Sequence, residues 1–493
     1  MNAPNESRAE LGGTVVVRRW EKLFWLAVGG GLLALLWSML CTVPGIPWNA
    51  ARLAPSFALA RGLPIYALRD SGAHLGWFYG PVFPLWFWPL SWVENPTVGL
   101  ALVAGWNALT IILPVFFVVR AALGGRVSVA GRATLIGVVL MLAHPTTQSA
   151  FYMVHVDAVC VACVLAACVA LHARVLSGWK PGLPVAAVAV ALAIATKQLA
   201  VVFVPASLVW LWREGHGRLV QAWLFWLVVC GGSLAGIFLA AFGAEELLFN
   251  VWLIHSRNAW QGGGAWLGAR FVELMVTGWV WWVVIAVVAL AVRPWERATL
   301  RPTAGAMVRL LGWAALWQLP LGLLATLKAG GGLNSVHALS YALVAGLIVL
   351  GAALARHDAE VTSGRKNLRM AWSMGAAVLL ALVVDFRMAV GRPVVWTPYR
   401  GLEELVAESK AYPGKRYYPW NPLITILSER KIYPFDDALK CLWIAQLEPP
   451  AEVIRAAIPS GAVIVYHEPS QSKFVLNYLG PEARQAANPR REP

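Results

Sequence analysis

The sequence predicts an all-α polytopic membrane domain of about 11 transmembrane helices, followed by a small C-terminal α/β domain. Two observations indicate the membrane part. Of the 493 residues, 59% are hydrophobic and only 13% are charged, whereas soluble domains carry about 25% charged residues, and several apolar runs reach the roughly 20 residues that cross a bilayer. The third observation is the polar composition of residues 391–493, a segment long enough to form a small soluble domain.

The transmembrane domain is expected over residues 1–390 and the soluble domain over 391–493. Apolar segments separated by Asp, Gly, Pro and basic clusters mark the predicted spans. These cover residues 23–43, 97–119, 133–150, 155–173, 182–196, 199–212, 219–242, 272–292, 307–327, 335–355 and 370–390. In the soluble part, the run "AVIVYHE" at 462–468 is typical of a β-strand.

Basic residues predict the orientation of the chain in the membrane. Lys and Arg are concentrated in the N-terminal segment and in every second loop after it, which is the bias of cytoplasmic loops. We therefore expect a protein of the cell (inner) membrane with a cytoplasmic N-terminus, an outer first loop at 44–96 and an extracytoplasmic C-terminal domain. The same bias explains the formal net charge of +15 without a nucleic-acid partner.

The first outer loop has two distinct parts. It begins with "PWNAARLAPSFALARG", which predicts a short amphipathic helix with Arg52 and Arg61 on its polar side. It continues through Asp70 and His74 into the apolar wall "WFYGPVFPLWFW", residues 77–88. Because desolvating charges beside an apolar wall costs free energy, the arrangement points to a function.

Few familiar motifs are present. The chain has six Cys, and Cys160-x-x-Cys163 lies inside an apolar helix without further metal ligands, so neither a zinc site nor a disulfide framework is expected. There is no GxxxxGK[ST] and no HExxH. No cofactor is predicted with certainty, and a divalent metal ion stays an option that no motif indicates.

Several ionisable residues collect at the predicted outer face. They are Asp70, His74, His155, Asp157, Lys197 and Lys328. Ionisable groups at membrane depth cost about 2.5–3.5 kcal/mol each on insertion scales and are often functional. Each also has a structural interpretation: Asp157 could cap the fourth span, Lys197 could snorkel, and Asp70 could be a solvated loop residue.

Spacing and context refine these candidates. His155 and Asp157 are two positions apart, so on a helix their side chains would point in different directions. Lys197 lies at a short break between two apolar runs, where a buried cation suits an anion. Lys328 precedes the turn "AGGGLN", whose free backbone N–H groups could also meet an anion.

Four motifs, in this order, resemble the GT-C superfamily of membrane glycosyltransferases, which includes dolichyl-phosphate-mannose mannosyltransferase-like enzymes. They are "GLPIYALRD…FYGPVFPLWFWPL", "HVDAVCVACVLAAC", "ATKQLAVVFVP" and "KAGGGLN", which ends at Asn334. The resemblance covers about residues 20–350. It implies a GT-C-like fold and a polyprenyl-phosphate-linked sugar donor.

The resemblance also implies roles for individual residues. Lys197, and Lys328 with it, would bind the lipid phosphate, Asp157 would orient the sugar or the acceptor, and the apolar wall would hold the polyprenyl chain. An acid in the first loop would act as base, but Asn49 stands at about its expected place, and an amide cannot accept the proton as a carboxylate does. Asp70 is the first alternative base and Asp157 the second; otherwise the enzyme is altered or inactive.

The sequence therefore predicts an integral-membrane glycosyltransferase that moves a hexose or pentose to an acceptor at the outer face. Its partners would be the donor, membrane lipids and an acceptor that is a lipid, a glycan or a protein. The predicted substrate-binding set is Asn49, Arg52, His74, His155, Lys197, Lys328 and Asn334. The alternatives are a transporter or flippase of a lipid-linked or anionic substrate, and a non-catalytic scaffold with the same fold.

Overall fold

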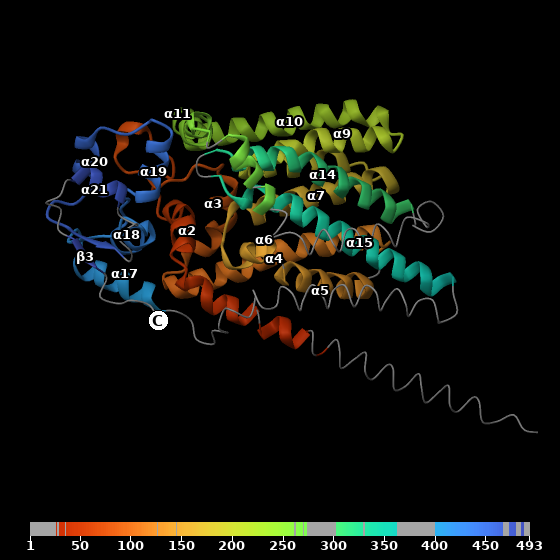
Figure 1. The fold of residues 1–493 in the computed structure, drawn as a ribbon, viewed down its shortest axis with the longest axis horizontal. Helices are drawn as coiled ribbons and strands as arrows, with labels where there is room; N and C mark the ends of the chain where they lie inside the picture. Colours follow the sequence, from red (N-terminus) through yellow and green to blue (C-terminus); the bar gives the residue numbers. More distant parts are fainter. Residues whose placement is uncertain are drawn as a thin grey trace, which may run out of the picture.

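The computed structural model describes residues 26, 29–34, 36–125, 127–143, 145–260, 263–269, 271–273, 302–328, 331–361, 400–466, 473–479 and 485–487. The described chain is mostly helical (Figure 1). Long helices run side by side through the membrane part, and the C-terminal helices, coloured blue, gather at one end of them.

The first loop and the membrane part form a series of helices. The 3-10 and π-helical turns are η1 (Val43–Gly45), η2 (Arg69–Ser71), η3 (Trp88–Trp92), η4 (Gln198–Val202), η5 (Phe249–Leu253) and η7 (Leu333–Val336). The α-helices are α2 (Pro47–Leu59), α3 (Val82–Phe87), α4 (Pro96–Ala122), α5 (Val127–Ala143), α6 (Pro145–Tyr152), α7 (Val156–Ser177), α8 (Gly182–Thr196), α9 (Phe203–Arg213), α10 (Gly217–Phe242), α11 (Ala244–Leu248), α12 (Ile254–Arg257), α14 (Pro302–Thr326) and α15 (His337–Val361).

Five described helices are long and apolar enough to cross a membrane, so the chain is a multi-pass membrane protein. They are α4, α7, α10, α14 and the first part of α15, and a bent pair over 29–45 and 47–59 would bring the number to six. Each of the five coincides with a predicted span. The predicted spans 272–292 and 370–390 lie outside the described residues apart from 272–273, so the total of about 11 stays a prediction.

Other predicted spans differ in the structure. The segment 133–150 falls on α5 and α6, which are described on either side of residue 144, a position outside the described residues. The segments 182–196 and 199–212 are present, but each is short. Lys197 lies between them with an extended backbone, φ −147° and ψ 119°.

Local sequence explains the ends of two central helices. Asn95 caps α4 by accepting a hydrogen bond from the Val98 amide at 2.9 Å, and Pro96 occupies its first position. The carboxylate of Asp157 lies in the first turn of α7, where the helix dipole favours negative charge. Gly178, with φ 70°, ends α7 in the left-handed conformation.

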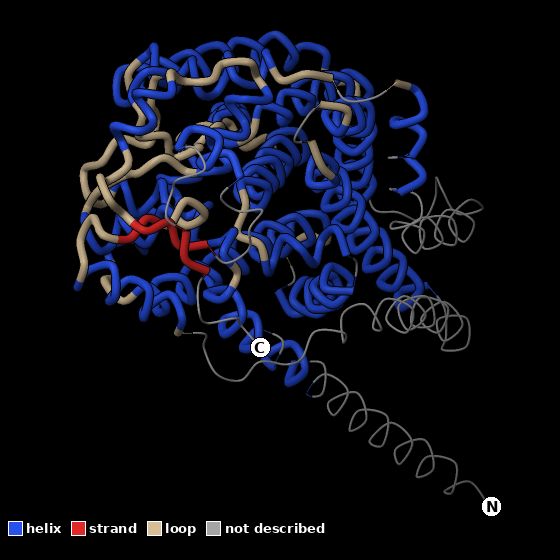
Figure 2. The backbone as a smooth tube through the Cα atoms, turned by 60° about the vertical axis from the view of Figure 1, so that its left-hand side comes forward, coloured by secondary structure: helices blue, strands red, loops and turns tan. Residues whose placement is uncertain are grey.

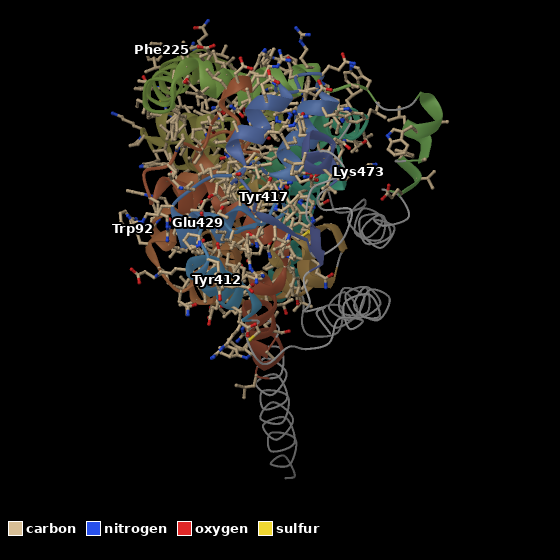
Figure 3. All side chains as sticks on the ribbon, turned by 90° about the vertical axis from the view of Figure 1, so that its left-hand side faces the viewer. Trp92, Phe225, Tyr412, Tyr417, Glu429 and Lys473 are labelled. Atoms are coloured by element: carbon tan, nitrogen blue, oxygen red, sulfur yellow. The ribbon has the colours of Figure 1, made fainter. Side chains whose placement is uncertain are left out.

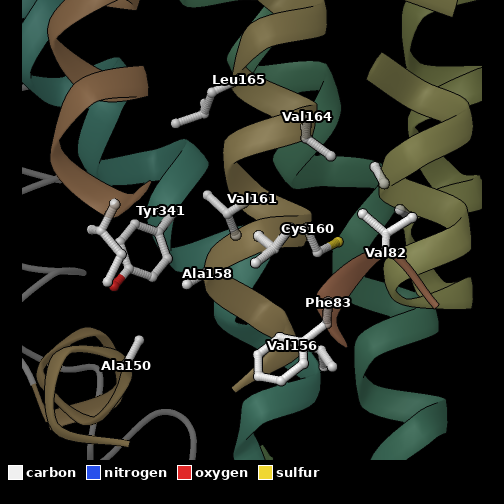
Figure 4. Close-up of a cluster of buried hydrophobic side chains, with 14 of the residues drawn as sticks. Val82, Phe83, Ala150, Val156, Ala158, Cys160, Val161, Val164, Leu165 and Tyr341 are labelled. Carbon is white, nitrogen blue, oxygen red and sulfur yellow. The ribbon is translucent and has the colours of Figure 1, made fainter. Parts of the chain in front are cut away.

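Helix α7 lies in the middle of the core. Small residues let α8 approach it closely: a Cβ on Gly182 would lie 2.6 Å from the Ala170 carbonyl oxygen. Figure 4 shows Val82 and Phe83 of α3 against one side of α7 and Tyr341 of α15 on the other. The first loop is therefore packed into the core of the membrane part and is not a separate surface feature.

The aromatic wall has two faces. Trp77, Phe83 and Phe87 are at most 2% exposed and belong to the core, whereas Trp86 is 38% exposed, and Trp92, just beyond the wall, is 62% exposed. Figure 3 shows Trp92, like Phe225 of α10, at the margin of the molecule. Only the outward half of the wall is therefore available to lipid.

The C-terminal segment combines helices with a small sheet. Three parallel strands, β1 (Arg416–Tyr417), β2 (Val463–Tyr466) and β3 (Gln485–Ala487), pair in the order β1-β2-β3, and they are drawn in red in Figure 2. Tyr417 is in register with Ile464, and Ile464 with Gln485. The helices are α17 (Gly401–Ala411), α18 (Pro422–Glu429), α19 (Asp436–Ile444), α20 (Ala451–Ala457) and α21 (Lys473–Leu479). The predicted domain boundary near 390 lies outside the described residues.

This C-terminal segment packs on the first loop. The Phe435 amide donates a hydrogen bond to the His74 carbonyl at 3.0 Å. Gly76, with φ 72°, lies so close to α19 that a Cβ would come within 2.9 Å of the Ala438 Cβ. Helix α18 packs against α2, and most of α2 is buried. The short helix predicted at this position is present as α2, and the C-terminal segment covers its apolar side.

A pH-dependent prediction follows from Asp436 at the start of α19. This carboxyl is 6% exposed and accepts a hydrogen bond from the Val475 amide at 2.8 Å. Burial raises the pKa of Asp436 to about 7, above its ordinary value of about 3.9. Since the folded state holds the proton more tightly, its stability falls as the pH rises from about 4 to about 7, by at most about 1.4 kcal/mol per pH unit.

Asp436→Asn keeps the acceptor oxygen and removes the charge. We expect hydrogen exchange in peptides covering 473–479 of the full chain in detergent to be slower in this variant than in wild type at pH 8. At pH 4 the difference should shrink or reverse. Asp437→Asn is the matched control and should change the profiles much less, because the Asp437 charge is a smaller cause of the raised pKa of Asp436 than burial is. Equal protection of wild type and Asp436→Asn at every pH would contradict the assignment.

Candidate functional site

The candidate site is a buried ion pair where three helix ends meet. Asp157 begins α7, Lys197 follows α8, and Asn334 lies just before α15. The Lys197 ammonium is 2.5 Å from Asp157 Oδ1 and donates a hydrogen bond to the Asn334 carbonyl oxygen at 3.1 Å. Both charged residues are buried, at 3% and 7% exposure. The structure thus brings together three residues that the sequence singled out separately.

His155 joins this ion pair through the second carboxylate oxygen. Its Nδ1 lies 2.6 Å from Asp157 Oδ2. The expectation that the two side chains point apart is wrong, because His155 is not helical: it precedes α7 with φ −142° and ψ 159°. An extended residue before a helix can direct its side chain back to the first turn.

His337, the first residue of α15, is a further residue of this cluster that the sequence did not single out. This residue is buried, and its Nδ1 lies 3.4 Å from Asp157 Oδ2. Its Nε2 lies 3.4 Å from the Ser149 hydroxyl. The signal was available, because His337 starts an apolar span directly after the "KAGGGLN" turn, just as His155 and Asp157 start the fourth one.

Asn49 supports this cluster from α2. Its amide nitrogen donates hydrogen bonds to the carbonyl oxygens of Val43 at 3.1 Å and Tyr152 at 2.8 Å. Its side-chain oxygen accepts one from the Val154 amide at 2.8 Å. These bonds fix the backbone directly before His155. The buried amide therefore acts as a clamp between the first loop and the start of α7.

Tyr79 of the apolar wall lies over the cluster. Its ring centroid is 5.5 Å from that of His155, in an edge-to-face arrangement, and 5.9 Å from that of His255. The neighbouring Gly80 contacts the end of α8 so closely that a Cβ would lie 1.7 Å from the Ala195 carbonyl oxygen. Only glycine fits there, and this contact fixes Tyr79 beside Lys197 and His155. Tyr79 was missed as an individual site residue because its motif was interpreted as a lipid surface.

Arg52 differs from the other cations of this region. Its guanidinium carbon is 5.6 Å from the Trp48 ring centroid and 5.9 Å from that of Tyr79. Among the described residues it has no carboxylate or carbonyl partner, whereas Lys197 is neutralised by Asp157. A guanidinium held by aromatic rings keeps its hydrogen-bond donors free for an anion.

Lys328 contacts His255, whose ring lies near that of Tyr79. The Lys328 ammonium donates to the His255 carbonyl at 2.9 Å and lies 5.1 Å from the Trp260 ring centroid. His255 Nε2 in turn donates to the Phe78 carbonyl at 2.8 Å. Cationic and aromatic groups therefore surround Tyr79.

Asp70 and His74 lie beside the C-terminal segment. Asp70 is exposed in η2, and within the described part of the chain no hydrogen bond or ion pair joins it to the Asp157 cluster. His74 is 3% exposed, and its Nε2 donates to the Arg69 carbonyl at 3.1 Å. Burial lowers the pKa of His74. Its contacts hold the loop against α19, as expected of a structural residue.

The chemistry of this arrangement is that of anion binding and proton transfer. It combines a buried carboxylate, a histidine with one nitrogen fixed by that carboxylate, and an arginine with free donors. Among the described residues, no group of three or more His, Cys, Asp or Glu has the arrangement of a metal site.

Comparisons with known proteins give one structural neighbour. No protein-family model matches the chain, and no curated protein matches it either. Among solved structures, the chain is similar to ArnT from Cupriavidus metallidurans, crystallised with undecaprenyl phosphate bound. The two chains are 11% identical, the TM-score is 0.48, and the match covers 94% of this chain and 89% of that one.

Proposed function

We propose that the chain is an integral-membrane glycosyltransferase that moves a sugar from a polyprenyl phosphate to an acceptor at the outer face of the cell membrane. The observation that carries the proposal is the Arg52 guanidinium, which has no carboxylate partner within the described part of the chain and lies beside the buried His155–Asp157–Lys197 cluster. A cation without a carboxylate partner is suited to a phosphate, and the adjacent cluster can transfer a proton.

The predicted residues have distinct places in this proposal. Arg52 is the first contact of the donor phosphate, and Lys328 adds positive charge in the same region. Lys197 is the second predicted phosphate ligand, although it shares its charge with Asp157. Asp157 orients the cluster, and the group that accepts the acceptor proton is either the predicted Asp70 or a member of this cluster. The exposed half of the apolar wall, with Trp86 and Trp88, borders the polyprenyl chain. The N-terminus is proposed to be cytoplasmic and the C-terminal segment extracytoplasmic.

Binding of undecaprenyl phosphate tests the anion site. We expect Arg52→Ala to weaken its binding to the detergent-purified chain at least about tenfold, because a charge-assisted hydrogen bond contributes about 1.5–3 kcal/mol and 1.4 kcal/mol is tenfold. Native mass spectrometry over a lipid titration gives the dissociation constant.

Arg213→Ala is the matched control for this experiment. Arg213 is exposed at the end of α9 and also lies over an aromatic ring, that of Trp212 at 5.4 Å. The control should bind the lipid like wild type. Unchanged affinity in Arg52→Ala would remove Arg52 from the site, and no binding by wild type would end the proposal of a polyprenyl-phosphate donor.

One observation favours the transporter alternative. Lys197 lies at a break between α8 and η4, and transporters place charged residues at interruptions of membrane helices. Sealed proteoliposomes distinguish the two functions. A transferase releases free undecaprenyl phosphate from an undecaprenyl-phosphate-linked sugar, whereas a flippase moves the intact lipid between leaflets.

A further inference from the structure

We propose that His155, oriented by Asp157, is the general base that accepts the proton of the acceptor hydroxyl. This inference rests on the proposed transferase function and names the group that performs its proton transfer. It replaces the carboxylate base that sequence reasoning sought in the first loop.

The hydrogen bond to Asp157 determines which nitrogen of His155 is free. An ionised carboxylate only accepts hydrogen bonds. The 2.6 Å contact between Nδ1 and Asp157 Oδ2 therefore places the ring proton on Nδ1 and leaves a lone pair on Nε2. Carboxylates orient and polarise histidine in the same way in the hydrolase triads.

Exposure of the two side chains agrees with this assignment. The His155 side chain is 14% exposed, whereas that of Asp157 is 4% exposed. His155 precedes α7 in an extended conformation, so its ring lies beyond the helix end, against Tyr79. The imidazole is thus the accessible member of the pair, and the carboxylate is behind it.

The carboxylate of Asp157 is itself poorly suited to be the base. Its Oδ1 is 2.5 Å from the Lys197 ammonium, and its Oδ2 is 2.6 Å from His155. Both oxygens are occupied, and a carboxylate paired with a cation is a weaker base. Asn49 cannot act as base either, since an amide does not take up the proton and its polar atoms bond to the backbone.

The proton transfer balances within the proposed reaction. The acceptor O–H proton moves to His155 Nε2 as the acceptor oxygen bonds to the anomeric carbon of the sugar. The bond between that carbon and the phosphate oxygen breaks, and its electron pair leaves with the polyprenyl phosphate. The resulting imidazolium lies against the Asp157 carboxylate, and it returns its proton to water after the product leaves.

Donor cleavage by His155 variants tests this inference. The probe is an undecaprenyl-phosphate-linked sugar, and the readout is release of undecaprenyl phosphate with water as acceptor. We expect His155→Gln, which can still hydrogen-bond to Asp157, to lower turnover about 10²–10⁴-fold while undecaprenyl phosphate binding changes less than threefold. His216→Gln, at the opposite end of the bundle before α10, should react like wild type.

A second variant separates a chemical role from a structural one. His155→Gly removes the ring, and added imidazole should restore part of its turnover in proportion to imidazole concentration. Wild-type turnover in His155→Gln, or a loss in His155→Gly that imidazole does not relieve, would overturn the inference. So would a loss confined to Asp70→Asn, which would identify that carboxylate as the base.

The outcome for wild type distinguishes this inference from the function on which it rests. If wild type binds undecaprenyl phosphate and releases it from the donor while His155→Gln does so equally well, only the inference fails. If wild type neither binds nor releases the lipid, the proposed function fails and the inference fails with it.

Discussion

Replacing Lys197 by Met should destabilise the chain by about 3–5 kcal/mol, because the substitution leaves the Asp157 carboxylate buried without its cation. The two groups are 2.5 Å apart and almost fully buried, so water cannot replace the lost partner. Met has a similar length, which limits any cavity left behind. Thermal unfolding in detergent, followed by tryptophan fluorescence, measures the effect.

Two further variants show whether the effect comes from the ion pair. Adding Asp157→Asn removes the orphaned charge, so the double variant should recover much of the lost stability. Lys180→Met removes a positive charge from an exposed position and should stay within about 0.5 kcal/mol of wild type. A single variant Lys197→Met as stable as wild type would mean that the buried pair contributes nothing to folding.

Asn49→Asp should also lower the stability and the turnover of the chain, although it introduces the acid that the family resemblance implies at this position. The Val43 and Tyr152 carbonyls lose their donors, and a carboxylate would face both of them in a buried place. Losing two hydrogen bonds costs about 0.5–1.5 kcal/mol each, and burying a carboxylate without a cationic partner adds to that cost. The segment before His155 should become less ordered, and donor cleavage should fall.

Asn95→Asp provides the same chemical change without the expected damage. The Asn95 side chain accepts a hydrogen bond at the start of α4, and Asp caps a helix as well as Asn does. Its unfolding temperature should therefore equal that of wild type. If Asn49→Asp were as stable as wild type and had a higher turnover, the structural role given to Asn49 would be wrong. Position 49 would then be a catalytic position at which this chain lacks the acid.

The five long helices were predictable from the sequence. In lipid, the backbone hydrogen bonds of each long apolar segment have to be made within the segment, and a helix does this. The sequence also predicted the interruption at Lys197, because a charged residue separates two apolar runs there. The predicted span 133–150 stays a prediction, because α5 ends at Ala143, α6 begins at Pro145, and residue 144 between them lies outside the described residues. Length and hydropathy do not reveal where a helix breaks within an apolar run.

The site was predictable only in part. Asp157, Lys197 and His155 stood out because charge is rare in apolar segments. Their mutual contacts depend on backbone conformation at one residue, since a helical His155 could not reach Asp157. The role of Asn49 depends on contacts with Tyr152 and Val154, about 100 positions away in the chain, which no local pattern encodes.

The contact between the C-terminal segment and the first loop has a consequence for biosynthesis. The His74 carbonyl accepts its hydrogen bond from the Phe435 amide. Ala51 and Phe78 share a small apolar cluster with Ala438. The loop is synthesised early, whereas the residues that cover it follow much later in the chain. Such a non-local pairing forms late, so a ribosome that stalls before residue 435 leaves an inserted protein whose loop core is uncovered. The core of the first loop can therefore be completed only after residues 435–438 have been synthesised.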